Sequence, residues 1–296
     1  MTPTLVRGHV RHAGRTPRVD SRARARDWSE IQERMLVPLY QAVYERLEVG
    51  GGTRLLALGC GTGLALLMAA SRGAAVTGTD SDFPERLALA RRRLRPGTAN
   101  PGGSAGSPHA RADVRIVDGP PDGDGLADAV RPGAARFNLV TAFEPIGGLP
   151  GDAEGLERPL AAAAPLAERG TPVVLAGWGP PERCATSSVL RVAGRPADPP
   201  RGAVPPAAAR DDLEEAAQNA GLRPDGSGRV ACPFGYADLD SAVRGMLSTG
   251  LFDAAVAASD RHQVGKELTE ALHAHRRRDG TVWMPNVFRY LIARVP

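Results

Sequence analysis

The feature that most constrains the fold is an apolar run that closes on glycines at alternate positions. Leu55–Leu58 predicts a buried strand, Gly59-Cys60-Gly61-Thr62-Gly63 a tight turn, and Leu64–Ala70 a helix. Such a turn can bend sharply and let a ligand lie against the main chain, because glycine has no side chain in the way. The helix that follows contributes free N–H groups and the positive end of its dipole. The segment therefore predicts a ligand-binding turn in an α/β protein.

Further apolar runs predict the rest of a sheet. They are residues 75–79, 114–117, 137–142, 172–176, 228–233 and 287–295. Helical patterns such as Glu85–Leu94 and Asp211–Ala220 separate them. Strands that alternate with helices predict a doubly wound, Rossmann-like α/β fold with a seven-stranded, mostly parallel sheet. The late strands predict an antiparallel C-terminal edge, and the mostly helical stretch 237–278 predicts a lid inserted before the last strand.

The N-terminal segment is strongly basic and the remainder is not. Residues 1–26 hold seven arginines and one aspartate, a net charge of +6, so residues 27–296 sum to −2 in a chain of net charge +4. We expect residues 1–27 to form a disordered tail, because apolar periodicity is missing there, and 28–296 to form the folded domain. A tail of this kind can also touch phosphates. Behind it, Ile31, Met35 and Leu39 predict a helix that Pro38 kinks or splits.

Several classes of protein are disfavoured by what the sequence lacks. No stretch of 18 or more apolar residues occurs, so no membrane span is expected, and no secretory signal is visible. Cys60, Cys184 and Cys232 lie far apart without a C-x-x-C pair, which argues against a disulfide framework and a metal site. A cytoplasmic protein is the expectation.

The spacing of the glycines narrows the ligand. A dinucleotide-binding G-x-G-x-x-G turn would need a glycine where Leu64 stands, and no Gly-Lys-Ser/Thr of a phosphate-binding loop follows. Asp80 closes the second predicted strand, 17 residues beyond Gly63, where a carboxylate can accept both hydroxyls of a ribose. A nucleoside that carries an amino-acid tail suits this combination.

These segments resemble class I S-adenosylmethionine-dependent methyltransferases, in particular the actinobacterial small-molecule, natural-product type. The resemblance runs from about Trp28 to the C-terminus and covers RLLALGCGTG, AAVTGTD, VRIVDG, FNLVTAFEP, GWGPPERC and RDGTVWMPNVFRYLIAR. It implies S-adenosylmethionine as cofactor, with Gly59, Gly61 and Gly63 around the methionine moiety, Asp80 on the ribose and Asp118 on the adenine. It adds as neighbouring cofactor positions Cys60, Ser81, Gly119 and Phe143.

The resemblance implies methyl transfer to a small organic molecule, a secondary metabolite, with no nucleic acid or membrane as partner and the oligomeric state left open. This chain departs from the family at two positions. Ala57 stands where the family has an acidic residue that helps fix the turn. The absence of that acid would weaken cofactor binding. Glu144-Pro145 stands where the subfamily often carries an asparagine-like residue.

Methyl transfer is an in-line displacement that needs alignment and exclusion of water, and a base only for a protonated acceptor. Glu144 is a candidate base or a contact of the methionine amine, and otherwise an exposed loop acid. His275 extends the apolar stripe of Val264, Leu268 and Leu272 and would point from the lid into the acceptor pocket; otherwise it is a satisfied core histidine.

Two tryptophans are candidates for contact with the substrate. Trp178 follows the fifth predicted strand and could stack on an acceptor, or simply pack at the rim. Trp28 begins the helix that folds over the cofactor in this family. Two alternative functions stay open: a non-catalytic binding protein or regulator on the same fold, and an RNA methyltransferase that uses the arginine tail. The slightly acidic remainder and the lack of an Asn-Pro-Pro-Tyr-type motif weigh against RNA.

Overall fold

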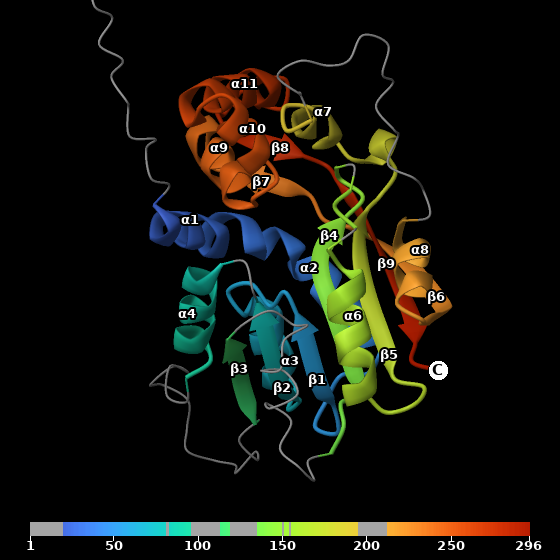
Figure 1. The fold of residues 1–296 in the computed structure, drawn as a ribbon. Coiled ribbons are helices and arrows are strands. Elements are labelled where there is room, and N and C mark those ends of the chain that lie inside the picture. The colour runs from blue at the N-terminus through green and yellow to red at the C-terminus, as the bar shows by residue number, and fades with distance from the viewer. Residues whose placement is uncertain are drawn as a thin grey trace, which may run out of the picture.

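A computed structural model describes residues 20–80, 83–95, 113–118, 135–149, 151–153, 155–194 and 212–296. Its centre is a seven-stranded sheet of order β3-β2-β1-β4-β5-β9-β6 (Figure 1). The strands are β1 (Arg54–Leu58), β2 (Ala75–Asp80), β3 (Val114–Asp118), β4 (Leu139–Ile146), β5 (Pro172–Trp178), β6 (Arg223–Ala231) and β9 (Val287–Arg294). β1 to β5 pair in parallel, and β9 runs antiparallel to both β5 and β6. The predicted mostly parallel, doubly wound sheet is confirmed, with β9 one position inside the edge that β6 forms.

Helices cover both faces of the sheet. β1 alternates between them, since Leu55 and Ala57 belong to one buried cluster while Leu56 and Leu58 belong to the other. The first cluster includes residues of α2 (Val37–Arg46), α3 (Leu64–Ser71) and α4 (Pro84–Arg93), and the second includes residues of α6 (Glu157–Ala163) and α8 (Asp212–Asn219). The carboxyl ends of β1, β2 and β4 therefore lie between two packed layers.

The N-terminal segment differs from the expectation of a tail to residue 27 and one helix behind it. α1 (Ser21–Asp27) is a helix whose first turn is capped by Asp20, which accepts hydrogen bonds from the backbone N–H groups of Arg22 and Ala23. A π-helical turn (Trp28–Gln32) and a 3₁₀ turn (Glu33–Leu36) follow before α2 begins. Pro38 lies in the first turn of α2, where its missing N–H costs no helical bond, which explains the break at this point. Residues 1–19 lie outside the described residues.

The stretch 237–278 folds into three helices: α9 (Leu239–Ser248), α10 (Asp253–Ala258) and α11 (Arg261–His273). We refer to them as the lid. The antiparallel strands β7 (Phe234–Tyr236) and β8 (Val282–Met284) lie on either side of the lid in the chain. The lid lies over α1, on the side of the sheet edge at which the parallel strands end (Figure 1).

The remaining short helical elements are the 3₁₀ turns Ala164–Leu166 and Pro181–Arg183 and the single-turn helix α7 (Ser187–Leu190). None of the helices in the described ranges is long and apolar enough to span a bilayer.

Candidate functional site

The turn after β1 is held in a conformation that suits glycine. Gly59, Gly61 and Gly63 have φ angles of 63°, 56° and 80°, in the left-handed region. A Cβ on Gly63 would lie 3.0 Å from the Cβ of Ala90 in α4, so the helix packs directly on the turn. The backbone N–H of Cys60 donates to the carbonyl of Thr79 in β2 at 2.9 Å, which ties the turn to the neighbouring strand.

Asp80 lies beside this turn, as the sequence predicts. It is the last residue of β2, its side chain is buried, and its Oδ2 accepts a hydrogen bond from the backbone N–H of Gly61 at 3.0 Å. The register of the parallel pair explains the proximity, because Leu58 of β1 lies opposite Thr79. Asp80 therefore fixes the turn in addition to any contact with a ligand.

Glu33 holds the same turn from the other side, and sequence reasoning missed it. The side chain is buried; its Oε1 accepts from the N–H groups of Thr62 at 3.1 Å and Leu64 at 3.3 Å, and the Thr62 hydroxyl donates to its Oε2. Arg93 of α4 donates to the same Oε2 at 2.6 Å and to Ser29 Oγ at 2.7 Å. An acid from the N-terminal segment thus supplies the support that Ala57 cannot.

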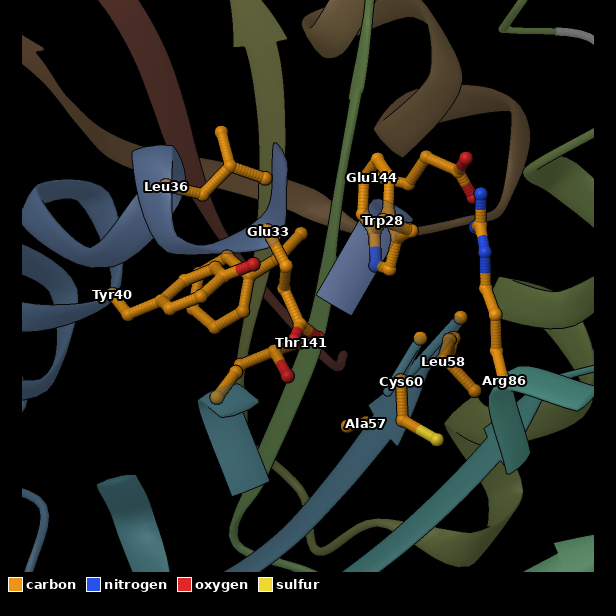
Figure 2. A pocket seen from close by; sticks show the side chains of 14 residues that line it. Trp28, Glu33, Leu36, Tyr40, Ala57, Leu58, Cys60, Arg86, Thr141 and Glu144 are labelled. Carbon is orange, nitrogen blue, oxygen red and sulfur yellow. The ribbon is translucent and has the colours of Figure 1, made fainter. Parts of the chain in front are cut away.

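A cavity opens over the turn, between the N-terminal segment, α4 and the end of β4 (Figure 2). It measures about 420 Å³ with its open mouth included. Tyr40 and Phe143 form an aromatic wall, with ring centroids 4.9 Å apart. Trp28, 8% exposed, lies across the turn: its Nε1 is 3.2 Å from the place that a Cβ of Gly61 would take. The lining residues are Trp28, Glu33, Leu36, Tyr40, Ala57, Leu58, Gly59, Cys60, Gly61, Ala65, Arg86, Thr141, Phe143 and Glu144.

A second cavity lies on the side of α6 and measures about 900 Å³, open solvent included. Both cavities share Leu58, Gly59 and Glu144. β4 loses its regular pairing with β5 between Ala142 and Ile146, a stretch that contains Pro145, which has no N–H to donate. Glu144 is exposed within this irregular stretch and so borders both cavities. A carboxylate at the junction of the two cavities can contact a ligand that extends from one cavity into the other.

Arg86 was also missed by sequence reasoning. It lies in the first turn of α4, is 2% exposed, and lines the cavity over the turn. Its guanidinium stacks on the rings of Phe83 at 3.9 Å and Trp28 at 4.2 Å, and its Nη2 donates to the carbonyl of Ser248 in α9 at 2.7 Å. In Figure 2 the side chains of Arg86 and Glu144 point toward the same part of the cavity. No sequence signal marked it, because two of its partners, Trp28 and Ser248, come from distant segments.

The structure brings together part of the predicted set. Gly59, Cys60, Gly61, Phe143, Glu144 and Trp28 all line the cavity over the turn, and Asp80 lines the neighbouring one. Burial raises the pKa of the Cys60 thiol well above its ordinary range, so this cysteine stays neutral. Ser81 and Gly119 lie outside the described residues.

Four of the predicted residues that the structure describes line neither cavity: Gly63, which packs against Ala90, and Asp118, Trp178 and His275. Asp118 ends β3 with its side chain 75% exposed and forms an ion pair with Arg91 at 2.6 Å. Trp178 packs on Phe288 and Phe234, at centroid distances of 4.6 and 5.8 Å, which matches the packing alternative. Both side chains therefore contact neighbouring elements, α4 for Asp118 and β7 and β9 for Trp178.

We expected His275 to extend the apolar stripe of the lid helix, and the structure differs. Val264, Leu268 and Leu272 are buried, but α11 ends at His273, so His275 belongs to the turn behind it. Its Nε2 lies 3.2 Å from the Oγ of Ser188 in α7. His275 lines neither of the two cavities.

Comparison with protein-family models and with curated proteins finds no match. Comparison with solved structures does. A putative methyltransferase from Bacillus halodurans is similar over 87% of this chain and 98% of its own, with a TM-score of 0.50 and 15% identity. YjhP from E. coli is similar over 93% and 99%, at 0.47 and 18%. Geranyl diphosphate methyltransferase, solved with S-adenosylmethionine, is similar over 92% and 90%, at 0.46 and 14%. The first of these similarities shows a shared Rossmann-like α/β fold.

Proposed function

We propose that the chain is a cytoplasmic S-adenosylmethionine-dependent methyltransferase that acts on a small organic molecule, a secondary metabolite. The observation that carries the proposal is the left-handed glycine turn after β1, supported by Asp80 on one side and Glu33 on the other. β1 lies between β2 and β4, at the point where the strand order reverses, and in open α/β sheets ligands bind outside the carboxyl ends of the strands at this point.

The residues at the turn fit a nucleoside with an amino-acid tail. A Cβ at Gly61 would meet Trp28 Nε1 at 3.2 Å and Glu33 Oε1 at 3.3 Å, so glycine lets these two cavity-lining side chains lie against the main chain of the turn. Trp28 Nε1 is a buried donor with no hydrogen-bond partner in the described chain, which a polar ligand group would satisfy. Gly59 and Gly61 would hold the methionine moiety and Asp80 the ribose.

The cofactor supplies a methyl carbon on a positively charged sulfur, which is already activated for displacement. What the chain must add is alignment and the exclusion of water. Tyr40, Phe143 and Trp28 give the cavity apolar walls, and the Tyr40 hydroxyl stays protonated because burial raises its pKa far above the ordinary value. Glu144, at the junction of the two cavities, would accept a proton from an acceptor that carries one.

Calorimetry with S-adenosylmethionine and S-adenosylhomocysteine tests the proposal. The wild type should bind both, and Gly61→Val should lose both, because a branched side chain is strained at a positive φ and meets Trp28 and Glu33. Gly52→Val is the matched control, since Gly52 has open space and no positive φ. A wild type that binds neither ligand would refute the proposal.

A non-catalytic binding protein on the same fold is the second candidate. Two observations favour it: His275 lies away from both cavities, and Trp28 lies across the turn. Labelled methyl transfer to a panel of phenols, carboxylic acids and amines separates the two functions. Tight cofactor binding without transfer to any member of the panel would favour the binding protein.

A further inference from the structure

Arg86 carries a buried charge that its neighbours compensate incompletely. Arginine has five N–H donors. One of them reaches the carbonyl of Ser248, while the Nε atom is buried without a hydrogen-bond partner in the described chain. Glu144 and Asp80 favour the charged form through space, but burial outweighs them and lowers the pKa below its ordinary value. A buried cation in this state is costly unless an anion joins it.

Trp28 contributes a second unsatisfied donor to the same cavity. Its Nε1 is buried and has no partner in the described residues, and its ring stacks on the Arg86 guanidinium at 4.2 Å. Buried donors are nearly always paired in folded proteins, so two orphans on touching side chains indicate one missing acceptor group. Both side chains line the cavity over the glycine turn.

The charge around the two donors limits what this acceptor can be. Glu144 lines the same cavity and Asp80 ends the adjacent strand, so a doubly charged phosphate would be repelled at short range. A carboxylate carries one charge and offers two oxygens, one for the indole N–H and one for the guanidinium.

We propose that Arg86 and Trp28 form a carboxylate-binding subsite at the glycine turn. The carboxylate comes from the amino-acid tail of the cofactor or from the methyl acceptor, and this choice of sources rests on the proposed function. Arg86 also bonds to α9, so a carboxylate bound here contacts the lid through a single side chain.

The test uses two substitutions that remove the donors and keep the bulk: Arg86→Met and Trp28→Phe. Arg92→Met, an exposed arginine of the same helix, and Trp283→Phe, a tryptophan 39% exposed on β8, are the matched controls. Calorimetry compares S-adenosylhomocysteine with 5′-methylthioadenosine, which lacks the amino-acid tail, and benzoate with the uncharged benzamide. Thermal melting checks that each variant folds.

If the cofactor supplies the carboxylate, both substitutions weaken S-adenosylhomocysteine at least about tenfold and change methylthioadenosine less than twofold. If the acceptor supplies it, the wild type prefers benzoate to benzamide and both variants lose that preference. Folded variants that retain wild-type affinity for every ligand, or that lose both nucleosides equally without an effect on benzoate, overturn the subsite. A wild type that binds benzoate but neither nucleoside refutes the proposed cofactor and leaves the carboxylate subsite standing.

Discussion

At the scale of single residues, the glycine turn shows that a carboxylate can support a turn from a distant position in the sequence, provided that the fold brings it close. The turn requires an acceptor for the N–H groups of Thr62 and Leu64, because the residue that precedes α3 is Gly63, which has no side chain to cap the helix. Glu33 meets that need from 29 residues before Thr62. Its negative charge also lies at the positive end of the α3 dipole.

Glu33→Ala should lower the free energy of unfolding by about 3 kcal/mol. It leaves two turn N–H groups and the Thr62 hydroxyl without their acceptor and removes the ion pair with Arg93, and breaking a buried pair costs on this order. Glu33→Gln keeps an acceptor oxygen and should lose less. Urea unfolding measures both, with the exposed Glu30→Ala as control. Equal stabilities of wild type and Glu33→Ala would mean that the turn holds itself.

Asp80→Ala should weaken S-adenosylmethionine about tenfold to a hundredfold in calorimetry. The substitution leaves the N–H of Gly61 unpaired and removes the acceptor expected for the ribose, each worth roughly 1–3 kcal/mol. Asp80→Asn keeps one oxygen for Gly61 and separates the two effects. A change below twofold for Asp80→Ala would show that the ribose is bound elsewhere.

At the scale of elements, sequence patterns located the parallel strands to within a few residues. β1 begins at Arg54 where Leu55 was predicted, because a buried strand is a continuous apolar run that needs no distant information. The hairpin of β7 and β8 was missed, since three-residue strands are too short to show a period. The apolar spacing that begins at Val264 includes His275, although α11 ends at His273, so the spacing alone placed the end of this helix too late.

The position of His275 predicts a pH dependence of stability. Burial lowers its pKa below the ordinary 6.5, so the unfolded chain binds more protons than the folded one below that pH. The contribution of His275 is complete above pH 6.5 and is lost as the pH falls through the folded-state pKa. Urea unfolding between pH 7.5 and 5 should therefore show a shallower loss of stability in His275→Gln than in the wild type. Parallel curves would place the ring in a solvent-like environment.

At the scale of the whole molecule, the N-terminal segment joins parts that lie far apart in the chain. Trp28 and Glu33 contact the glycine turn, the hydroxyl of Ser21 donates to Glu85 in α4 at 2.6 Å, and Arg24 donates to Asp253 in the lid at 2.9 Å. The sequence marked this stretch only as the end of a basic tail followed by a helix. It could not show the connection, because the segment's partners are long-range and polar and leave no apolar period.

Two truncations separate this segment from the arginine-rich residues before it. Deletion of residues 1–19 removes four arginines and brings the net charge from +4 to 0, but it leaves every described contact intact. Deletion of residues 1–36 also removes Trp28, Glu33 and Leu36 from the cavity wall. We expect the first truncation to bind S-adenosylmethionine within about twofold of the wild type and the second to lose binding and melt at a lower temperature.

Calorimetry and thermal melting of the two truncated chains decide between the segments. The stability loss of the Glu33→Ala variant should account for part of the stability loss of the longer deletion, because that deletion also removes Glu33. Loss of cofactor affinity or of activity in the shorter truncation would contradict the expectation. It would assign the first 19 residues a part in the reaction, and their four positive charges would then bring a polyanionic acceptor such as RNA back into consideration.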